Sequence, residues 1–493
     1  MRKAILLSSL SLGMILSLVT GCSNSTTNTA ATPANSAPVS LSITDTPPAG
    51  VNVLSFEVSL TSANLMPASG TGAVSLLRNN LPIELDVTQL QTLSAFLNTA
   101  NVPAGTYNSL SLTFANPKLV IYNASDASLA SSCAVGTVCR LTPTIDNSAT
   151  TTLSSTPFPA TIAANMPLGL LVDFQLNNVI QPDLSVNLGA TNGVTVSELT
   201  PTATPTPQYG HLTGTVQSIN ASQNQFTVQT AYGNTYTIAA SSTTLYSSFP
   251  ATVCTTGSIA CLSAGQIVRV QITGVASGGV LTAGQVTYLQ AAGMQTAEGS
   301  IVGLTTTNGT TVMKLILHGN PSNDEGLPMG GEAMVTIGAG ATYSINSNGY
   351  TVPTGLTFTG ASSLYVGQQV LVNVVAGSLN STAGTTSSGT WGAPQPLTFT
   401  THTVELEPSQ FTGPVSAVNT GTSSFTLGGQ WWMSPINVET GAQTVFQGFT
   451  PASFSSVTSN SVVSVYGFLF APASGSTTPT LAAETVILRT PGM

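Results

Sequence analysis

A cysteine directly behind an apolar N-terminal run is the residue with the clearest chemistry in this sequence. The run 4–19 follows two basic residues and ends on Thr20, Gly21 and Cys22. A basic start, an apolar stretch and small residues before a cleavage point are the parts of a secretory signal. Because the thiol of Cys22 can carry a lipid, we expect residues 1–21 to be removed and Cys22 to be lipidated.

The length of the apolar run favours cleavage over a retained membrane anchor. A spanning helix needs roughly 20 apolar residues, and the run 4–19 is shorter. Ser23 follows the cysteine. In bacterial lipoproteins an Asp at this position tends to retain the protein in the inner membrane. A sequence with Ser at this position therefore resembles lipoproteins of the outer membrane. We therefore expect an exported protein, held on the cell envelope by its lipid, with residues 22–38 as a flexible tether.

The other cysteines form two close pairs, Cys133 with Cys139 and Cys254 with Cys261. An exported protein meets an oxidising compartment, so both pairs are expected to form disulfides. The alternative is a metal site, but zinc usually takes four ligands at tighter spacings and no histidine lies near either pair.

A second candidate metal site lies in the segment HGNPSNDEGLPMGGE. His318, Asp324, Glu325 and Glu332 offer an imidazole and three carboxylates to a cation. The spacing does not match a calcium loop, whose ligands fall at fixed positions around a turn glycine. A polar hairpin is the favoured interpretation, and we expect no cofactor.

Two pairs of acids could suggest glycoside hydrolysis, in which two carboxylates flank the bond. Glu84 is spaced by two from Asp86, and Glu405 by two from Glu407. On a strand this spacing places both acids on one face. We interpret each pair as the solvated side of an amphipathic strand.

Nucleophilic catalysis has little support in the sequence. The histidines are His211, His318 and His402, and no G-x-S-x-G motif is present. A triad assembled from distant residues stays possible. Asp45, two residues before Pro47, is expected to cap its own turn through an Asx hydrogen bond. We expect no enzymatic activity.

Two adjacent tryptophans give a slightly stronger binding signal. On a strand, Trp431 and Trp432 must point to opposite faces, so only one enters a single core. Exposed indoles stack on sugars and are common at binding surfaces. Packing between domains is the alternative and the favoured interpretation.

The charge balance excludes nucleic acid as a partner. Only 5% of residues are charged and the net charge is −9, whereas phosphate backbones require clustered lysine and arginine. The chain is 42% hydrophobic, too apolar for a disordered protein, so we expect it to fold.

Alternating apolar residues predict strands throughout residues 39–199. One helix is expected at about Thr88–Leu97, with Asp86 or Thr88 as its cap. Seven or more strands in a domain of this size indicate a two-sheet sandwich. The Pro-rich segment 200–208 is expected to be a stiff linker.

The motifs TDTP, VLSFEVSLTSANL, PIELDVTQLQTL and VPAGTY resemble the family called domain of unknown function 4382, over about residues 40–200. This resemblance implies an exported β-domain with no established activity and no catalytic residues to transfer.

The rest of the chain repeats itself in three units, 209–290, 294–407 and 409–490. Gly214-Thr-Val216 recurs as Gly413-Pro-Val415, and LSAGQIVRV recurs as LYVGQQVLV. The units resemble domain of unknown function 5666, and by analogy we expect small OB-like β-barrels. The fold class is therefore all-β: a sandwich with one short helix, then three tandem barrels.

Taken together, the sequence predicts a non-catalytic lipid-anchored envelope protein that acts as a scaffold or partner-binding surface. Its expected partners are the membrane, through the lipid, and an envelope polysaccharide or protein. A glycan- or wall-binding lipoprotein is the first alternative, and an envelope hydrolase is the second.

Overall fold

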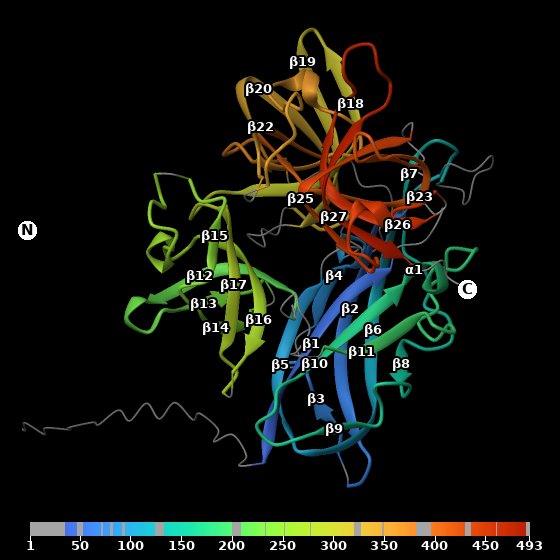
Figure 1. Ribbon diagram of the computed structural model, residues 1–493, viewed down its shortest axis with the longest axis vertical. Helices are drawn as coiled ribbons and strands as arrows, with labels where there is room; N and C mark the ends of the chain where they lie inside the picture. Colours follow the sequence, from blue (N-terminus) through green and yellow to red (C-terminus); the bar gives the residue numbers. More distant parts are fainter. Residues whose placement is uncertain are drawn as a thin grey trace, which may run out of the picture.

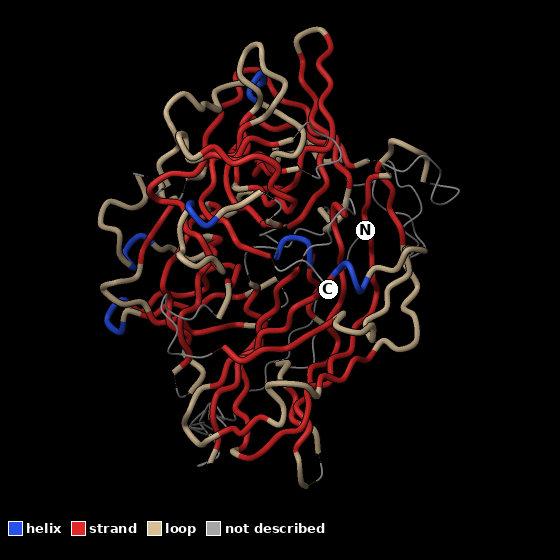
Figure 2. Tube along the Cα trace, turned by 45° about the vertical axis from the view of Figure 1, so that its right-hand side comes forward, coloured by secondary structure: helices blue, strands red, loops and turns tan. Residues whose placement is uncertain are grey.

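The protein is built almost entirely of β-strands (Figures 1 and 2). The computed structural model describes residues 35–46, 53–70, 72–78, 82–90, 94–123, 133–199, 209–231, 233–250, 252–276, 278–319, 327–347, 350–380, 396–428, 435–459 and 461–489. The all-β fold class predicted from the alternation of apolar residues is confirmed.

The N-terminal domain is the expected two-sheet sandwich. The strands of one sheet are β11 (Val194–Leu199), β10 (Leu168–Gln175), β1 (Ser36–Thr46) and β5 (Ala95–Pro103), in this order. The strands of the other are β2 (Val53–Pro67), β3 (Val74–Ser75), β4 (Ile83–Asp86), β6 (Gly105–Tyr122), β7 (Val138–Leu141), β8 (Thr150–Leu153) and β9 (Ala160–Ile162). Apolar side chains from both sheets, such as Phe114 and Phe174, form the core between them, with ring centroids 5.2 Å apart.

The predicted helix at Thr88–Leu97 is wrong. A 3-10 turn, η1 (Val87–Leu90), is followed from Ala95 by β5. The leucine spacing there is not a helical face, because Leu97 packs in the sandwich core while its neighbour Phe96 packs in the first barrel. The one α-helix of the described residues is short, α1 (Leu176–Val179), and follows β10.

The predicted Asx turn at Asp45 is also wrong. Asp45 lies within β1, opposite Phe174 of β10, and is fully buried. Neither carboxylate oxygen has a hydrogen-bond partner within the described part of the chain. Burial, and then the nearby Asp173, raise the pKa of Asp45 well above its usual value.

Each of the three repeats forms a five-stranded closed ring. The first contains β12 (His211–Asn220), β13 (Gln225–Gln229), β14 (Thr235–Ala239), β16 (Ile267–Val275) and β17 (Leu281–Gln290), with β15 (Leu245–Ser247) added beside β17. The second contains β18 (Thr296–Thr307), β19 (Thr310–Gly319), β20 (Glu332–Ile345), β21 (Gln369–Asn373) and β22 (Leu397–Glu407). The third contains β23 (Ser409–Asn419), β24 (Ser424–Leu427), β25 (Ile436–Gln447), β26 (Val462–Phe470) and β27 (Thr480–Arg489). Short 3-10 turns occur at η2 (Ala221–Gln223), η3 (Ile259–Cys261), η4 (Ala361–Ser363) and η6 (Phe454–Ser456).

The strand pairing is the same in all three rings. The first strand pairs with the second and fourth, the second with the third, and the last closes the ring between the third and fourth. The third and last strands are parallel in each ring, and the other pairs are antiparallel. This is the small Greek-key barrel expected for an OB-like domain.

The four domains pack against one another. Figure 1 shows the first barrel beside the sandwich and the other two barrels above it. The edge strand β5 meets β12 where the backbone N–H of His211 donates to Ser94 O at 2.7 Å. The third barrel contributes Phe468 and Phe470 to the apolar core of the second. The sandwich and the three barrels therefore meet at one junction.

Both predicted disulfides are present: Cys133 is bonded to Cys139, and Cys254 to Cys261. Among the described residues, no helix has the length and apolar character needed to cross a membrane.

Replacing Cys254 and Cys261 together by serine should destabilise the first barrel by about 2 kcal/mol, because the bond closes a short loop in the unfolded chain. Chemical denaturation of this variant, with and without reductant, measures the effect. In the variant, the stability of this barrel should not change when reductant is added. An unchanged midpoint in the variant would contradict the prediction.

Candidate functional site

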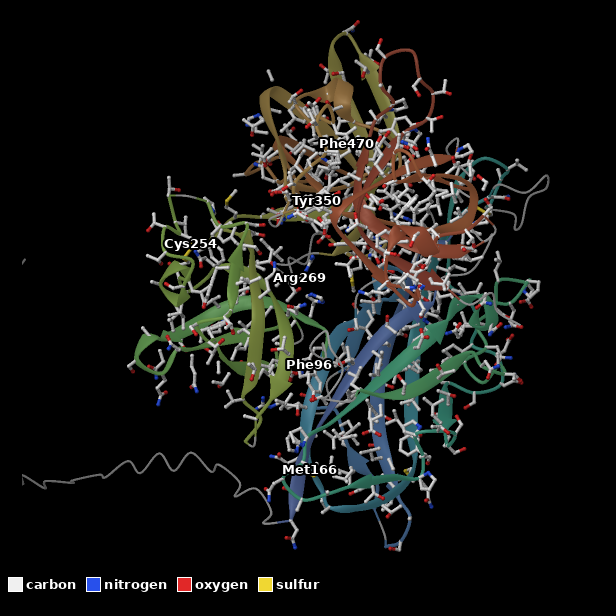
Figure 3. All side chains as sticks on the ribbon, in the orientation of Figure 1. Phe96, Met166, Cys254, Arg269, Tyr350 and Phe470 are labelled. Carbon is white, nitrogen blue, oxygen red and sulfur yellow. A yellow bond between two sulfur atoms is a disulfide. The ribbon has the colours of Figure 1, made fainter. Side chains whose placement is uncertain are left out.

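A cavity of about 420 Å³ lies where all four domains meet. The sandwich contributes β4 and the start of β5, the first barrel contributes β12 and Arg269, and the second and third barrels contribute Glu298 and Tyr466. In Figure 3, Arg269 lies on the first barrel toward this junction. The volume is within the range of small-molecule sites, which is about 300–1,000 Å³.

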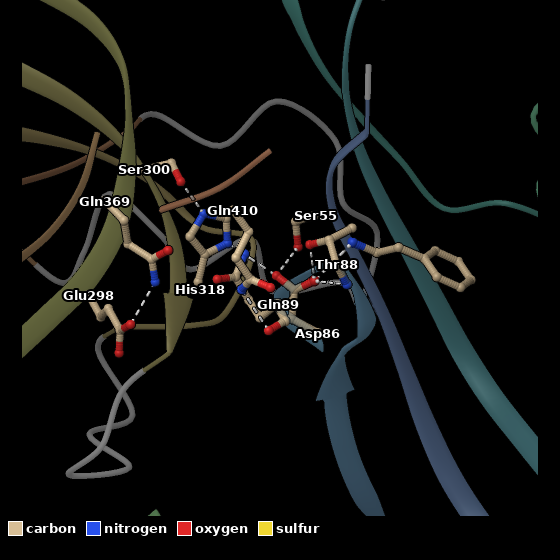
Figure 4. A network of polar contacts seen from close by, with 10 residues as sticks. Ser55, Asp86, Thr88, Gln89, Glu298, Ser300, His318, Gln369 and Gln410 are labelled. Atoms are coloured by element: carbon tan, nitrogen blue, oxygen red, sulfur yellow. Dashed lines mark hydrogen bonds and ion pairs between the residues drawn. The ribbon is translucent and has the colours of Figure 1, made fainter. Parts of the chain in front are cut away.

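An ion pair crosses the cavity wall between the first and second barrels. Arg269 Nη2 lies 3.6 Å from Glu298 Oε2, and the side chains are 24% and 14% exposed. The amide of Gln369 donates to Glu298 Oε1 at 2.6 Å (Figure 4). The strand residues Val268 and Val270 point into the barrel core, so the alternation of β16 turns Arg269 outward to the junction.

A second acid from the same barrel is buried in the cavity wall. Glu407 is 4% exposed and accepts a hydrogen bond from Asn346 Nδ2 at 2.9 Å. Burial, and then the charges of Glu298 and Glu405, raise the pKa of Glu407 well above its usual value. The cavity wall therefore holds one carboxyl in an ion pair with Arg269 and a second whose protonated form is favoured by burial.

Asp86 of the sandwich is the most heavily bonded acid at the junction. Its carboxylate accepts hydrogen bonds from Ser55 Oγ at 2.8 Å, from Phe56 N at 3.1 Å, and from Thr88 through N at 3.2 Å and Oγ1 at 2.6 Å (Figure 4). His318 Nδ1 of the second barrel lies 3.2 Å away. Burial would raise the pKa of Asp86, but the hydrogen bond and charge of His318, with the bonds from Thr88 and Ser55, lower it below its usual value.

His318 joins this carboxylate to a serine hydroxyl. Ser300 Oγ, on the neighbouring strand β18, lies 2.7 Å from His318 Nε2. The Asp86 carboxylate accepts the Nδ1 proton of His318, and the Ser300 hydroxyl shares a hydrogen bond with Nε2 on the other side of the ring. The histidine and aspartate side chains are each 2% exposed.

The other histidine of the cavity is neutral. Burial, and then the charge of Arg269, lower the pKa of His211 to about 4, so it carries no charge at neutral pH. His402 lies exposed on β22, away from the residues that line the cavity.

The interpretation of the paired acids as solvated strand faces is wrong for one acid of each pair. Glu84 is exposed as expected, but Asp86 and Glu407 are both buried. Both lie in the cavity wall, while Glu405 is partly buried and burial raises its pKa. The polar face of each strand is therefore turned partly toward a second domain, which buries one acid of each pair.

The structure separates the members of the proposed metal site that it describes. His318 binds Asp86 and Ser300, whereas Glu332 pairs with Lys314 at 3.1 Å. Asp324 and Glu325 lie outside the described residues. Within the described ranges there is no group of three or more His, Cys, Asp or Glu residues that could hold a metal ion.

Three other predicted positions also lie outside the described residues: Cys22, Trp431 and Trp432. The sequence analysis missed Arg269, Glu298, Gln369 and Ser300. Nothing in the sequence marks these residues as functional, because each occupies an ordinary polar position on an alternating strand. Only the charges of Arg269 and Glu298 could have drawn attention to them, since charged residues are rare in this chain.

Comparison with protein-family models finds two matches. Domain of unknown function DUF4382 matches residues 36–196, and domain of unknown function DUF5666 matches residues 213–287 and 412–474. A search of curated proteins finds no match to the chain. The second barrel lies outside the matched ranges, but it has the strand pairing of the other two. The chain therefore combines an N-terminal DUF4382 domain with DUF5666 domains that form its first and third barrels.

Proposed function

We propose that this chain is a lipid-anchored envelope protein whose four domains together bind a hydroxyl-rich ligand, of mono- or disaccharide size, in the central cavity. The observation that carries this proposal is the cavity of about 420 Å³ with walls from all four domains. A scaffold of independent modules has no need of a shared polar cavity.

The chemistry of the walls supports a sugar-like ligand. Glu298, Gln369 and Glu407 offer acceptors and donors to hydroxyl groups, and burial raises the pKa of Glu407 and so favours its donor form. Apolar residues such as Met329 and Pro408 line the same space and suit the C–H faces of a sugar ring. Arg269 is paired with Glu298, so its positive charge is already balanced and does not favour an anionic ligand.

The anchor is supported by the sequence of residues 1–23. The intact mass of the mature N-terminal peptide tests it, and an acylated Cys22 is the expected result. A mature protein that still begins with Met1 and carries no lipid would overturn this part of the proposal.

Isothermal titration calorimetry with defined neutral and N-acetylated mono- and disaccharides tests the binding site. At least one sugar should bind with a Kd below about 1 mM, which is a free energy of about −4 kcal/mol. Glu298→Ala should weaken that binding at least about tenfold, because it removes a charged acceptor. Glu198→Ala, which truncates an exposed acid of β11, is the matched control and should bind as the wild type does.

Two results would contradict this site. If none of the sugars binds, the protein acts as a scaffold or partner-binding surface, as the sequence predicted. If Trp432→Ala removes binding and Glu298→Ala does not, the glycan site lies at the tryptophan pair and not in the cavity.

A further inference from the structure

We propose that Ser300, His318 and Asp86 form a nucleophilic site that hydrolyses a short-chain acyl ester, with the acyl group beside Ser300. The alcohol part of that ester rests on the proposed function, since it would occupy the central cavity. The acyl chemistry rests on the three side chains alone.

The three side chains have the relative positions of a serine-hydrolase triad. In such a triad the serine hydroxyl donates to Nε2 of the histidine, and Nδ1–H donates to a buried carboxylate. Here Ser300 Oγ lies 2.7 Å from Nε2, and Asp86 Oδ2 lies 3.2 Å from Nδ1 (Figure 4). Both distances are within the range of a nucleophile and its base.

Asp86 is fixed in place by the sandwich. The donors from Ser55, Phe56 and Thr88 hold its carboxylate, so the imidazole that it accepts from has one tautomer and one orientation. The alternative is that these side chains only hold the two domains together. The Asp86–His318 contact would be enough for that role, and it would not require a partly exposed serine on the other nitrogen of the ring.

Ser300 opens onto a small side pocket of about 60 Å³. Its lining residues include the apolar Leu54 and Val302, which pack together between the sandwich and the second barrel. A water needs about 10–15 Å³ of such space, so the pocket has room for an acetyl or propionyl group and not for a long chain. His318 and Gln369 line both this pocket and the central cavity, so the two spaces adjoin.

The fold also places an amide donor next to the serine. Gln369 is the cross-strand partner of Ser300 between β21 and β18, and side chains at such positions lie about 5 Å apart at Cβ. The Gln369 amide carries two hydrogens, and its bond to Glu298 uses one of them. The other is the donor that would stabilise a negative oxygen formed beside Ser300.

The reaction runs in two steps with water as the second reactant. Ser300 Oγ attacks the acyl carbon, its proton passes to His318 Nε2, and the ester C–O bond breaks as the alcohol leaves with that proton. Water then attacks the acyl-serine, giving a proton to Nε2, and the free acid leaves as that proton returns to Ser300 Oγ. Asp86 stays ionised and stabilises the imidazolium in both steps.

Labelling with a fluorophosphonate probe tests the nucleophile directly. Peptide mass spectrometry should place the adduct on Ser300 in the wild type, and Ser300→Ala should lose it. Release of p-nitrophenol from p-nitrophenyl acetate should fall at least about 100-fold in Ser300→Ala and in His318→Gln. Ser197→Ala, an exposed serine of β11, is the matched control and should keep both the adduct and the turnover.

The failure of this inference is distinct from that of the binding proposal. Ser300→Ala removes only a hydroxyl, so its circular dichroism and its sugar binding should match the wild type. An unlabelled wild type, an adduct elsewhere, or full turnover in Ser300→Ala overturns the acyl site even where sugars bind. Turnover that depends on Ser300 without any sugar binding overturns the cavity ligand instead.

Discussion

Asp86→Ala will lower the free energy of unfolding by about 3–5 kcal/mol, the largest single effect expected in this molecule. The carboxylate accepts hydrogen bonds from Ser55, Phe56, Thr88 and His318. Its removal leaves those buried donors without an acceptor, and each such group costs about 1–3 kcal/mol in the folded state. Differential scanning calorimetry and urea denaturation measure the loss.

The control for Asp86 is Glu198→Ala, which removes an exposed acid from the same domain. A surface substitution of this kind should change stability by no more than about 0.5 kcal/mol. Asp86→Asn separates charge from hydrogen bonding, because it keeps the shape and one acceptor. Equal stability of Asp86→Ala and the wild type would show that the network in Figure 4 contributes nothing to folding.

Glu484→Gln will make the protein more stable at pH 8 and leave it nearly unchanged at pH 5. Glu484 lies on β27, and its Oε1 is buried with no hydrogen-bond partner within the described structure. Burial raises its pKa from 4.5 to about 7. The folded state therefore holds a proton that the unfolded state releases, so its contribution to stability is complete below about pH 4.5 and is lost as pH rises through 7.

The expected gain at pH 8 is on the order of 2–3 kcal/mol, since one pKa unit corresponds to about 1.4 kcal/mol. Glutamine keeps the shape of the protonated acid and never ionises. Urea denaturation at pH 5 and pH 8 measures the difference, with exposed Glu198→Gln as the matched control. A stability profile in Glu484→Gln that falls with pH as steeply as in the wild type would refute the assignment to this carboxyl.

The local parts of the fold were predictable because they depend on nearest neighbours in the chain. Alternation with period two identified the strands, since it states which side chains share a face. The close cysteine pairs identified the disulfides, and the repeated motifs identified the three barrels. Each of these features is complete within a few tens of residues.

The errors occurred where a strand meets a second domain. Phe96 and Leu97 are both buried because β5 has the sandwich core on one face and the first barrel on the other. This double burial removed the alternation and left a leucine spacing that resembled a helix. Glu407 was predicted to face solvent because it lies on the polar face of β22. The third barrel, which follows directly in the sequence, covers that face and buries Glu407.

The sequence by itself determined the strand pattern, the domain series, the disulfides and the low charge, because each follows from residue types and short spacings. Only the tertiary structure decided that Asp86, Ser300 and His318 meet. Ser300 and His318 are brought together by the register of β18 and β19, and Asp86 comes from another domain 232 residues away along the chain. Contacts of this kind depend on how whole domains pack against one another. No local pattern in a single sequence predicts that packing.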